Sequence, residues 1–275
     1  MSLFVASLNS GSNGNSYYIA NDQEAVLIDA GLSCRETDRR MKRLGLSLKN
    51  VKAIFITHEH SDHVSGVYSI YKKYRIPVYI TTSTLRQSQL KSVEAYHFTP
   101  DNPIAIGRLT VWPFPIDHDA RDPHNFMISN ESVNVGVFTD IGKVTDPVIH
   151  YFSQCHAAFL ESNYDIDLLE TGRYPLALKK RIREGFGHLS NLQAAQLFTT
   201  YRPPFMSHLF LSHLSQHNNS PKIVQSLFEG LSEDTEVVVA SRYKETKLFH
   251  IRAEKSHMKL TPYPGVVSPV QLELF

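Results

Sequence analysis

Short apolar runs, many with a period of two and broken by turn residues, dominate the first half of the chain and predict a protein rich in strands. Residues 3–8 alternate as expected for a strand, and the Gly- and Asn-rich segment 9–16 predicts a loop before a second strand at 17–20. Further strands are expected at residues 25–31, 52–57, 78–80, 95–98, 109–116, 125–129 and 133–138.

Patterns of helical period lie between some of these strands. They predict helices over residues 33–44, from about residue 62 to residue 74, and over residues 83–91. Strands mixed with helices, without a Gly-rich phosphate loop, favour an α/β fold in which two sheets pack together under covering helices. We expect one folded domain over residues 1–255 and a tail over residues 256–275.

The strand expected at 52–57 runs directly into a segment rich in metal ligands, namely His58, His60, Asp62 and His63. Residues two apart in extended backbone point the same way, so His58 and His60 can face one point. Asp62 and His63 open the next helix and can aim at that point too. Imidazole and carboxylate groups suit zinc, manganese or iron, so this turn predicts a metal site.

Three later strands also end in ligand-type residues, His118, Asp140 and His213. With the first turn they provide seven nitrogen or oxygen ligands, more than one tetrahedral ion needs. That number suits two divalent cations that share a bridging carboxylate and lower the pKa of water toward neutrality. Asp29, at the end of another strand, either orients a ligand histidine or caps the helix expected at 33–44.

Composition adds few constraints. The chain has 275 residues, 42% of them hydrophobic, and a formal net charge of +1, so its total charge implies no nucleic-acid partner. Cys34 and Cys155 are too few for a disulfide framework. The N-terminal segment does not resemble a signal peptide, and no apolar run is long enough to span a membrane. We therefore expect a soluble, cytoplasmic protein.

Two segments in the second half offer an acid–base pair. Glu161 ends an apolar run, and His188 precedes a Ser/Asn helix cap. A carboxylate beside an imidazole keeps it protonated, so His188 would act as a general acid on a departing oxygen. The alternative is that Glu161 caps a helix and His188 is an ordinary loop residue.

Substrate contacts are expected near the same segments. Lys180 and Arg181 belong to a basic stretch that either binds phosphates or forms a solvated helix face. Backbone donors of the helix that begins near Ser190 would bind another phosphate. Asn163 and Asn191 are further candidates for substrate contacts. Asn218 and Asn219 are expected to cap the following helix rather than to touch substrate.

The ordered series Asp29, His58-x-His60-x-Asp62-His63, His118, Asp140 and His213 resembles the five motifs of the metallo-β-lactamase superfamily. This resemblance implies a four-layer αβ/βα sandwich with a dinuclear site at one edge. It places His58, His60 and His118 on one metal and Asp62, His63 and His213 on the other, with Asp140 bridging. True β-lactamases usually have cysteine where Asp140 stands and lack the histidine that matches His63, so antibiotic hydrolysis is not expected.

The segments Leu-Glu-Ser-Asn-Tyr-Asp, Gly-His-Leu-Ser-Asn and Ser-His-Leu-Ser-x-x-Asn-Asn together resemble the YycJ/WalJ group, regarded as 5′-to-3′ DNA exonucleases. The resemblance implies a DNA substrate, with RNA as the alternative, and two Zn²⁺ or Mn²⁺ ions. The pair formed by Glu161 and His188 also resembles the glutamate–histidine pair of tRNA 3′-processing endonucleases in the superfamily. Tyr164 stands where some members have histidine and receives no ligand role. Asp140 and His213 are too close in sequence for an inserted β-CASP domain.

The chain ends in Gln271-Leu272-Glu-Leu274-Phe275, which resembles the peptide that docks bacterial repair and replication enzymes on the DNA sliding clamp. The alternative is that these apolar residues pack on their own domain. Two other functions stay open. One is a small-molecule hydrolase, either a cyclic-nucleotide phosphodiesterase or a glyoxalase-II-like thioesterase, and the other is a clamp-binding module without turnover.

Overall fold

The protein, seen in a computed structural model, is described here over residues 2–100, 102–253 and 260–264. Within these residues the strands form two seven-stranded sheets. The first sheet has the order β14 (Phe249–Arg252), β1 (Ser2–Asn9), β2 (Ser16–Ala20), β3 (Ala25–Ile28), β4 (Val51–Phe55), β5 (Val78–Tyr79), β6 (Ala95–Tyr96). The second has the order β13 (Glu236–Val239), β12 (His208–Ser212), β11 (Ala157–Glu161), β10 (Val133–Phe138), β9 (His124–Asn130), β8 (Leu109–Pro115), β7 (Ile104–Ile106).

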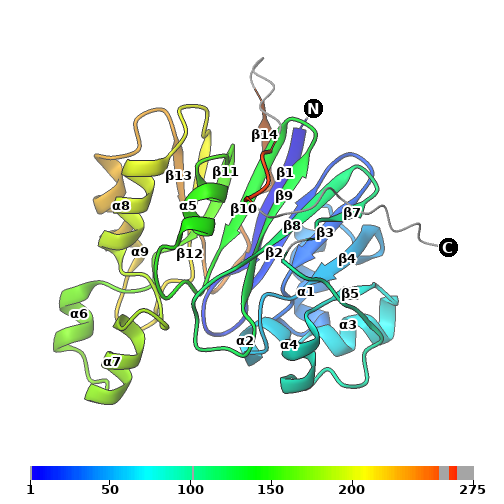
Figure 1. Cartoon of the computed structure of the whole chain (residues 1–275), viewed down its shortest axis with the longest axis horizontal. Coiled ribbons are helices and arrows are strands. Elements are labelled where there is room, and N and C mark those ends of the chain that lie inside the picture. The colour runs from blue at the N-terminus through cyan, green and yellow to red at the C-terminus, as the bar shows by residue number, and fades with distance from the viewer. Residues whose placement is uncertain (1, 101, 254–259, 265–275) are drawn as a thin grey trace.

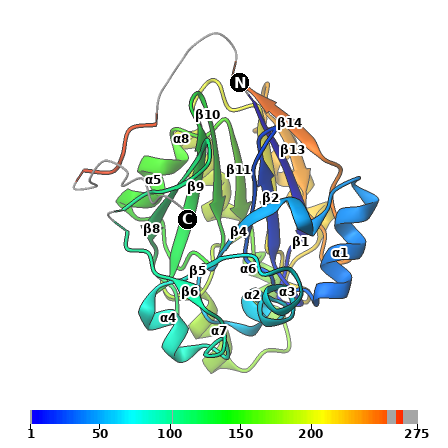
Figure 2. The ribbon, with the colours of Figure 1, turned by 90° about the vertical axis from the view of Figure 1, so that its right-hand side faces the viewer.

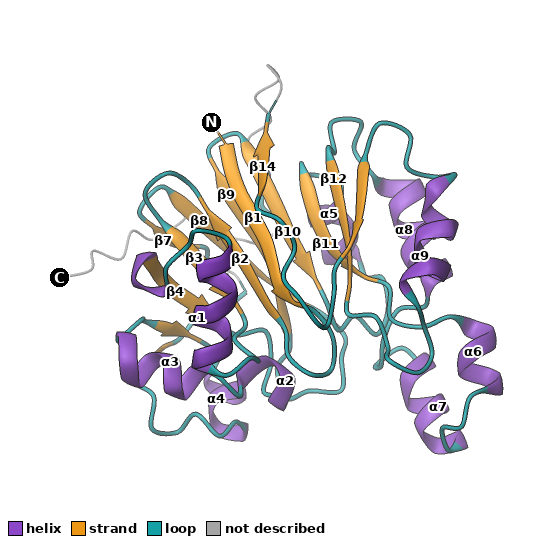
Figure 3. Cartoon of the chain, turned by 180° about the vertical axis from the view of Figure 1, so that it is seen from behind, coloured by secondary structure: helices purple, strands orange, loops and turns teal. Residues whose placement is uncertain are grey.

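Helices cover the outer face of each sheet, which gives four layers (Figure 1). Helices α1 (Cys34–Arg43) and α3 (Val67–Tyr74) pack on the first sheet, and α5 (Asp146–Phe152), α8 (Asn191–Tyr201) and α9 (Pro221–Glu229) on the second (Figure 3). The remaining elements are η1 (Leu48–Asn50), α2 (Ser61–Val64), α4 (Thr82–Gln87), α6 (Ile166–Thr171) and α7 (Leu176–Arg183). The expected four-layer αβ/βα sandwich is confirmed.

Three apolar clusters correspond to the three interfaces between layers. Val5, Phe55 and Phe159 belong to the cluster between the two sheets. The other two clusters lie under the helices of the first and second sheet. A strand covered on both faces is buried at every position, which explains the uninterrupted burial of β3, β10 and β11.

One end of the sandwich carries most of the irregular structure. Helices α2, α4 and α7 lie at this end in two perpendicular views (Figures 1 and 2). Strands β10, β11 and β12 pair in parallel, so their carboxyl ends meet at one edge of the second sheet. Ligand sites in α/β proteins lie beyond such strand ends, so this end positions the site described below.

The element predictions hold with two main differences. The helix expected from about residue 62 to residue 74 is divided into α2 and α3 at Gly66. The Gly66 N–H donates to the Ala30 carbonyl at 2.8 Å, and a Cβ here would lie 1.7 Å from the Leu32 carbonyl oxygen. The helix expected at 83–91 ends at Gln87, because Ser88 is extended and its hydroxyl accepts the Leu90 N–H.

Residues 260–264 pack against α5. Thr261 donates its N–H to Gln154 Oε1 at 2.7 Å, and its carbonyl accepts from His150 Nε2 at 2.8 Å. Leu260 and Tyr263 add to the apolar cluster beneath this helix. The expected clamp-binding peptide, Gln271 to Phe275, lies outside the described residues. No helix in the described part of the chain has the length and apolar character that crossing a membrane requires.

Candidate active site

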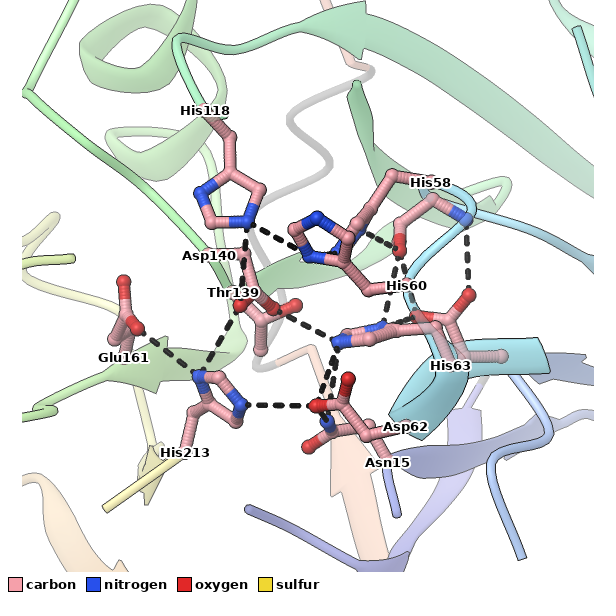
Figure 4. A network of polar contacts seen from close by, with 12 residues as sticks. Asn15, His58, His60, Asp62, His63, His118, Thr139, Asp140, Glu161 and His213 are labelled. Atoms are coloured by element: carbon pink, nitrogen blue, oxygen red, sulfur yellow. Dashed lines mark hydrogen bonds and ion pairs between the residues drawn. The ribbon is translucent and has the colours of Figure 1, made fainter. Parts of the chain in front are cut away.

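The candidate site is assembled at the ends of strands from both sheets (Figure 4). Each of six strands ends at, or just before, one residue that contributes to it. In chain order the strands are β3, β4, β8, β10, β11 and β12, and the residues are Asp29, His58, His118, Asp140, Glu161 and His213. His60, Asp62 and His63 complete it from the turn after β4. The structure thus brings all seven predicted ligands into one cluster.

Three of these residues have left-handed backbone conformations. The φ angles of Asp29, Asp140 and His213 are 59°, 57° and 55°. This region is uncommon for residues other than glycine and costs on the order of 1–3 kcal/mol where the surroundings impose it. Each residue ends or follows a strand, so the turn redirects its side chain toward the cluster. Such strain is typical of functional sites.

Close backbone packing fixes the turn that carries His60, Asp62 and His63. The Asp62 carbonyl accepts the Asn15 N–H at 2.7 Å, and the His63 carbonyl accepts the Ala30 N–H at 2.9 Å. A Cβ on Gly31 would lie 1.7 Å from the Asp62 carbonyl oxygen, so only glycine permits this approach. The turn is therefore anchored by the loops after β1 and β3.

His58, His60 and His118 form the first potential metal-binding group. His58 Nε2 lies 3.0 Å from His60 Nδ1, and His118 Nε2 lies 3.4 Å from the same atom. Nitrogens bound at 2.0–2.1 Å to one tetrahedral ion lie roughly 3.3 Å apart. The spacing of the three imidazoles therefore fits one cation.

Asp62, His63 and His213 form the second group. Asp62 Oδ2 lies 3.4 Å from His63 Nε2 and 3.6 Å from His213 Nε2. Asp140 stands between the two groups. Its Oδ2 is 3.2 Å from His63 Nε2, and its Oδ1 is 3.8 Å from His118 Nε2. One carboxylate oxygen therefore faces each group.

Two neighbours determine how the ligand imidazoles are oriented. Asp29 Oδ2 accepts a hydrogen bond from His63 Nδ1 at 2.7 Å, which leaves His63 Nε2 directed toward the cluster. Thr57 holds Asp29 by donating its N–H at 2.9 Å and its hydroxyl at 2.8 Å. His118 Nδ1 donates to the Gly187 carbonyl at 3.0 Å, which leaves its Nε2 open. Asp29 thus orients a histidine, and Ser33 is the residue that caps α1.

The electrostatics of the cluster favour bound cations. Burial lowers the pKa of His58 and His118, which keeps both imidazoles in the neutral form that binds metal. Burial opposes the charge of His63, but Asp29, Asp140 and Asp62 outweigh it and raise the pKa of His63 well above its usual value. The site contains four carboxylates, those of Asp29, Asp62, Asp140 and Glu161. Among the described residues, they form ion pairs only with histidines. The cluster therefore requires positive charge.

Two atoms at the centre of the cluster lack hydrogen-bond partners. Asp140 Oδ2 and His213 Nε2 are buried and form no hydrogen bond with the described residues, although they have ion-pair contacts with His63 and Asp62. A buried carboxylate oxygen or imidazole nitrogen without a partner is unfavourable unless a further group binds it. Both atoms are metal-ligand types, so the residues present fit divalent cations.

Glu161 and His188 are in direct contact beside the ligand cluster. Glu161 Oε1 lies 2.7 Å from His188 Nδ1 and 3.1 Å from His213 Nδ1. Its Oε2 accepts the Ile141 N–H at 2.8 Å and the Leu189 N–H at 3.3 Å. Burial opposes ionisation of Glu161, but the charge of His188 and the hydrogen bonds from the imidazoles of His188 and His213 lower the pKa of Glu161. The carboxylate is thus ionised and holds a proton on His188 Nδ1.

A cavity of about 230 Å³ opens onto the cluster. His188 lines it, with 22% of its side chain exposed. Arg181 also lines the cavity and pairs with Asp119. Asn163 lines it too, but donates its amide to the His213 carbonyl at 2.8 Å. Lys180 does not line the cavity and lies 3.8 Å from Glu184.

Ser190 and Asn191, expected to contact substrate, are used inside the fold instead. Ser190 caps α8 by accepting the Gln193 N–H, and Gln193 Oε1 accepts the Ser190 N–H in return. The Asn191 amide contacts Ser162 and Asn219, and both Ser190 and Asn191 are buried. The N–H groups of Ser190, Asn191 and Gln193 at this helix end are therefore engaged within the fold.

The Asn218–Asn219 pair also differs from expectation, because Ser220 caps α9. Asn219 instead donates its amide to the carbonyls of Ser162 and Asn163, at 2.8 and 3.0 Å. It thus ties the loop after β11 to the loop after β12.

Three supporting residues were not identified from the sequence, namely Asn15, Ser10 and Thr57. Asn15 Nδ2 lies 3.0 Å from Asp62 Oδ2 and 3.1 Å from His63 Nε2. Ser10 Oγ accepts the His213 N–H at 2.7 Å. For Asn15 and Ser10 the polar loop between β1 and β2 was the only available signal, and its composition is equally typical of an ordinary turn.

Comparison with known proteins identifies a family whose members match most of the chain. The model of the metallo-β-lactamase superfamily matches residues 10–123. The exodeoxyribonuclease YycJ of Bacillus anthracis is 32% identical over 230 residues, which cover 82% of this chain and 87% of the relative. The exodeoxyribonuclease WalJ of Streptococcus pneumoniae is 30% identical over 219 residues, with 77% and 81% coverage.

The fold also matches solved structures. The metallo-β-lactamase fold protein YhfI from Bacillus subtilis superposes with a TM-score of 0.71, covering 91% of this chain and 100% of that one. The two sequences are 17% identical, so this likeness concerns the fold alone.

Proposed function

The chain belongs to the metallo-β-lactamase superfamily, within its YycJ-like group of hydrolases, and we propose that it is a two-metal 5′-to-3′ DNA exonuclease. The relatives at about 30% identity are exodeoxyribonucleases, which supports a nucleic-acid substrate. The single observation that carries the proposal is the Glu161–His188 contact at 2.7 Å beside Asp140. A hydrolase that expels an alkoxide from a phosphodiester benefits from such a proton donor.

The proposed ligands divide as the geometry does. His58, His60 and His118 would hold one divalent cation and Asp62, His63 and His213 the other, with an oxygen of Asp140 toward each. Zn²⁺ or Mn²⁺ in these positions would activate water at neutral pH and polarise the phosphate.

The chain's own residues would supply the rest of the chemistry. Glu161 holds the proton of His188 Nδ1, so His188 can donate a second proton from Nε2 to the leaving oxygen. Glu161 also accepts from His213 Nδ1, so one carboxylate orients a ligand and the proposed acid. Arg181 lines the cavity and would bind a substrate phosphate in place of its present partner, Asp119.

A cellular role in DNA repair or replication forms part of the proposal. It depends on clamp docking through the peptide from Gln271 to Phe275. Deletion of residues 271–275 should abolish binding to a bacterial sliding clamp and spare turnover of free DNA. Retained clamp binding would contradict this part of the proposal without affecting the nuclease assignment.

The central test is degradation of 5′-phosphorylated single- and double-stranded DNA with Mn²⁺ or Zn²⁺. Asp62→Ala should lose both metal content and cleavage, and His188→Ala should lose cleavage with its metal retained. Asp22→Ala and His250→Ala, which change exposed residues outside the site, are the matched controls and should behave as wild type.

The same assay separates the alternative functions. Wild-type protein that degrades neither DNA nor RNA with either metal would refute the nuclease proposal. Hydrolysis of a cyclic nucleotide or a glutathione thioester in that case would support a small-molecule hydrolase. The cavity of about 230 Å³ can also accommodate a small substrate.

A further inference from the structure

A second cavity of about 340 Å³ adjoins the candidate active site. Leu214 and Ser215, just after His213, line both cavities, so the two cavities adjoin at these residues. The segment 239–244, which begins at the last residue of β13, also lines the second cavity. None of the residues in this cavity has a role in the proposed chemistry.

The charge of this second cavity is entirely positive among its described lining residues. Arg242 and Lys244 line it, and no carboxylate does. Arg242 Nη2 donates to Ser12 Oγ at 3.0 Å, and Ser12 lines the active-site cavity. Arg242 Nη1 is buried and has no hydrogen-bond partner among the described residues. Two cations with no carboxylate among the lining residues, beside the candidate active site, favour an anionic ligand.

Tyr243 supplies an aromatic surface at the same place. Tyr243 is 73% exposed, more than any other exposed aromatic residue in the described part of the chain. Its backbone is nevertheless held, because its carbonyl accepts from Arg40 Nη2 at 3.1 Å and its N–H donates to Ser241 Oγ at 3.1 Å.

Buried contacts in turn fix Arg40. Its Nη1 donates to the Leu8 carbonyl and to Asn9 Oδ1, at 2.7 Å each, and its side chain is almost fully buried. A second link joins the same segment to α1, where Arg43 pairs with Glu245. An exposed ring on a well-anchored backbone is preorganised for stacking, because little further order is lost on binding.

We infer that this second cavity is a nucleotide subsite for the strand whose scissile phosphate reaches the metal ligands. One base stacks on Tyr243, and Arg242 and Lys244 bind the adjoining phosphates. This combination of an aromatic platform with a basic groove is typical of single-strand binding without sequence preference. The inference rests on the proposed nuclease function and adds where the rest of the strand lies.

The subsite predicts a dependence of turnover on strand length. Tyr243→Ala should lower the ratio of kcat/KM for a single-stranded thymidine hexanucleotide to that for bis(4-nitrophenyl) phosphate by about tenfold, mainly through KM. Tyr243→Trp should keep the ratio. The matched control is Tyr68→Ala, which removes an exposed tyrosine from α3 and should leave the ratio unchanged.

A binding measurement without turnover supplements the kinetics. In metal-loaded protein carrying His188→Ala and Tyr243→Trp, the hexanucleotide should quench the added indole, while the buried Trp112 gives the background. Arg242→Gln should weaken this binding and reduce its dependence on salt concentration. Quenching supports the subsite, and its absence overturns it.

The outcomes distinguish the two levels of inference. Wild-type protein that cleaves no oligonucleotide would refute the proposed function. Wild-type protein that cleaves the hexanucleotide, together with Tyr243→Ala at the wild-type ratio, would refute the subsite alone.

Discussion

Glu161 and His188 are joined by a 2.7 Å contact between Oε1 and Nδ1, although they lie on different segments, at the end of β11 and before α8. The carboxylate is fully buried, whereas the imidazole is partly exposed in the active-site cavity. Because Oε2 of Glu161 also accepts two backbone N–H groups, the carboxylate cannot move without breaking those bonds. The fixed Glu161 carboxylate therefore determines the orientation of the His188 imidazole.

Replacement of this carboxylate should impair catalysis more than folding. Glu161→Gln keeps the shape of the side chain but removes the charge that stabilises a protonated His188. We expect kcat to fall by roughly 10²–10⁴-fold, the usual contribution of a general acid. Steady-state kinetics at saturating Mn²⁺ measure this, with metal content determined in parallel. An unchanged kcat would remove Glu161 from the mechanism.

Asp29 should control metal affinity without contacting the metal. Asp29→Asn tolerates the left-handed backbone but accepts the His63 Nδ1 proton more weakly. Loss of such an orienting carboxylate lowers metal affinity by roughly 10–100-fold. Competition of the purified protein with a chromophoric chelator measures the affinity. The control is Asp22→Asn, which changes an exposed residue in the turn between β2 and β3. A metal affinity of Asp29→Asn equal to that of wild type would contradict the assigned role.

Asn219 should matter for stability. Its Nδ2 donates to the carbonyls of Ser162 and Asn163, and its Oδ1 accepts from Asn191 Nδ2 in the interior. Asn219→Ala leaves buried polar groups unpaired, so the free energy of unfolding should drop by about 3 kcal/mol. Urea unfolding measures the difference. The neighbouring Asn218→Ala is the control, because the Asn218 amide nitrogen has no hydrogen-bond partner among the described residues, and it should cost far less.

His156 should make the protein sensitive to acid. Burial lowers the pKa of His156 from 6.5 to about 4. Between these two pH values the imidazole is therefore neutral in the folded protein but binds a proton in the unfolded chain. Stability from this group is complete above pH 6.5 and is lost as the pH falls toward 4, by up to roughly 3 kcal/mol.

The His156→Gln variant tests this prediction because glutamine does not titrate and can still accept the Asn134 N–H. Its free energy of unfolding should fall less steeply than that of wild type between pH 6.5 and 4. His217→Gln, which changes an exposed histidine, is the control and should follow the wild-type curve. Parallel curves for wild type and His156→Gln would show that this residue does not determine the acid limb.

The sequence predicted the fold class and the family, and both are confirmed. The ligand residues could be recognised because His58, His60, Asp62 and His63 stand together after an apolar run. The Glu161–His188 pair could be proposed from strand-end position and cap chemistry, although nothing in the spacing determines that they touch.

Other features depend on partners that are distant in sequence. The sequence shows Ser190 as a helix cap but does not show that Gln193 and the loop after β11 already occupy its donors. The supporting roles of Asn15 and Ser10 depend on contacts with Asp62 and with the backbone of His213. The break at Gly66 results from the approach of the Leu32 carbonyl, which a local pattern does not contain.

The distribution of site residues over six strand ends also bears on the order of assembly during synthesis. The chain segment through the turn after β10 carries His58, His60, Asp62, His63, His118 and Asp140, but His213 follows β12, much later in the chain. Bound cations would close a long loop between these segments, and the gain from such a cross-link grows with the length enclosed. A nascent chain without β12 would therefore lack one proposed ligand of the second group, and complete metal loading would occur only at the end of folding.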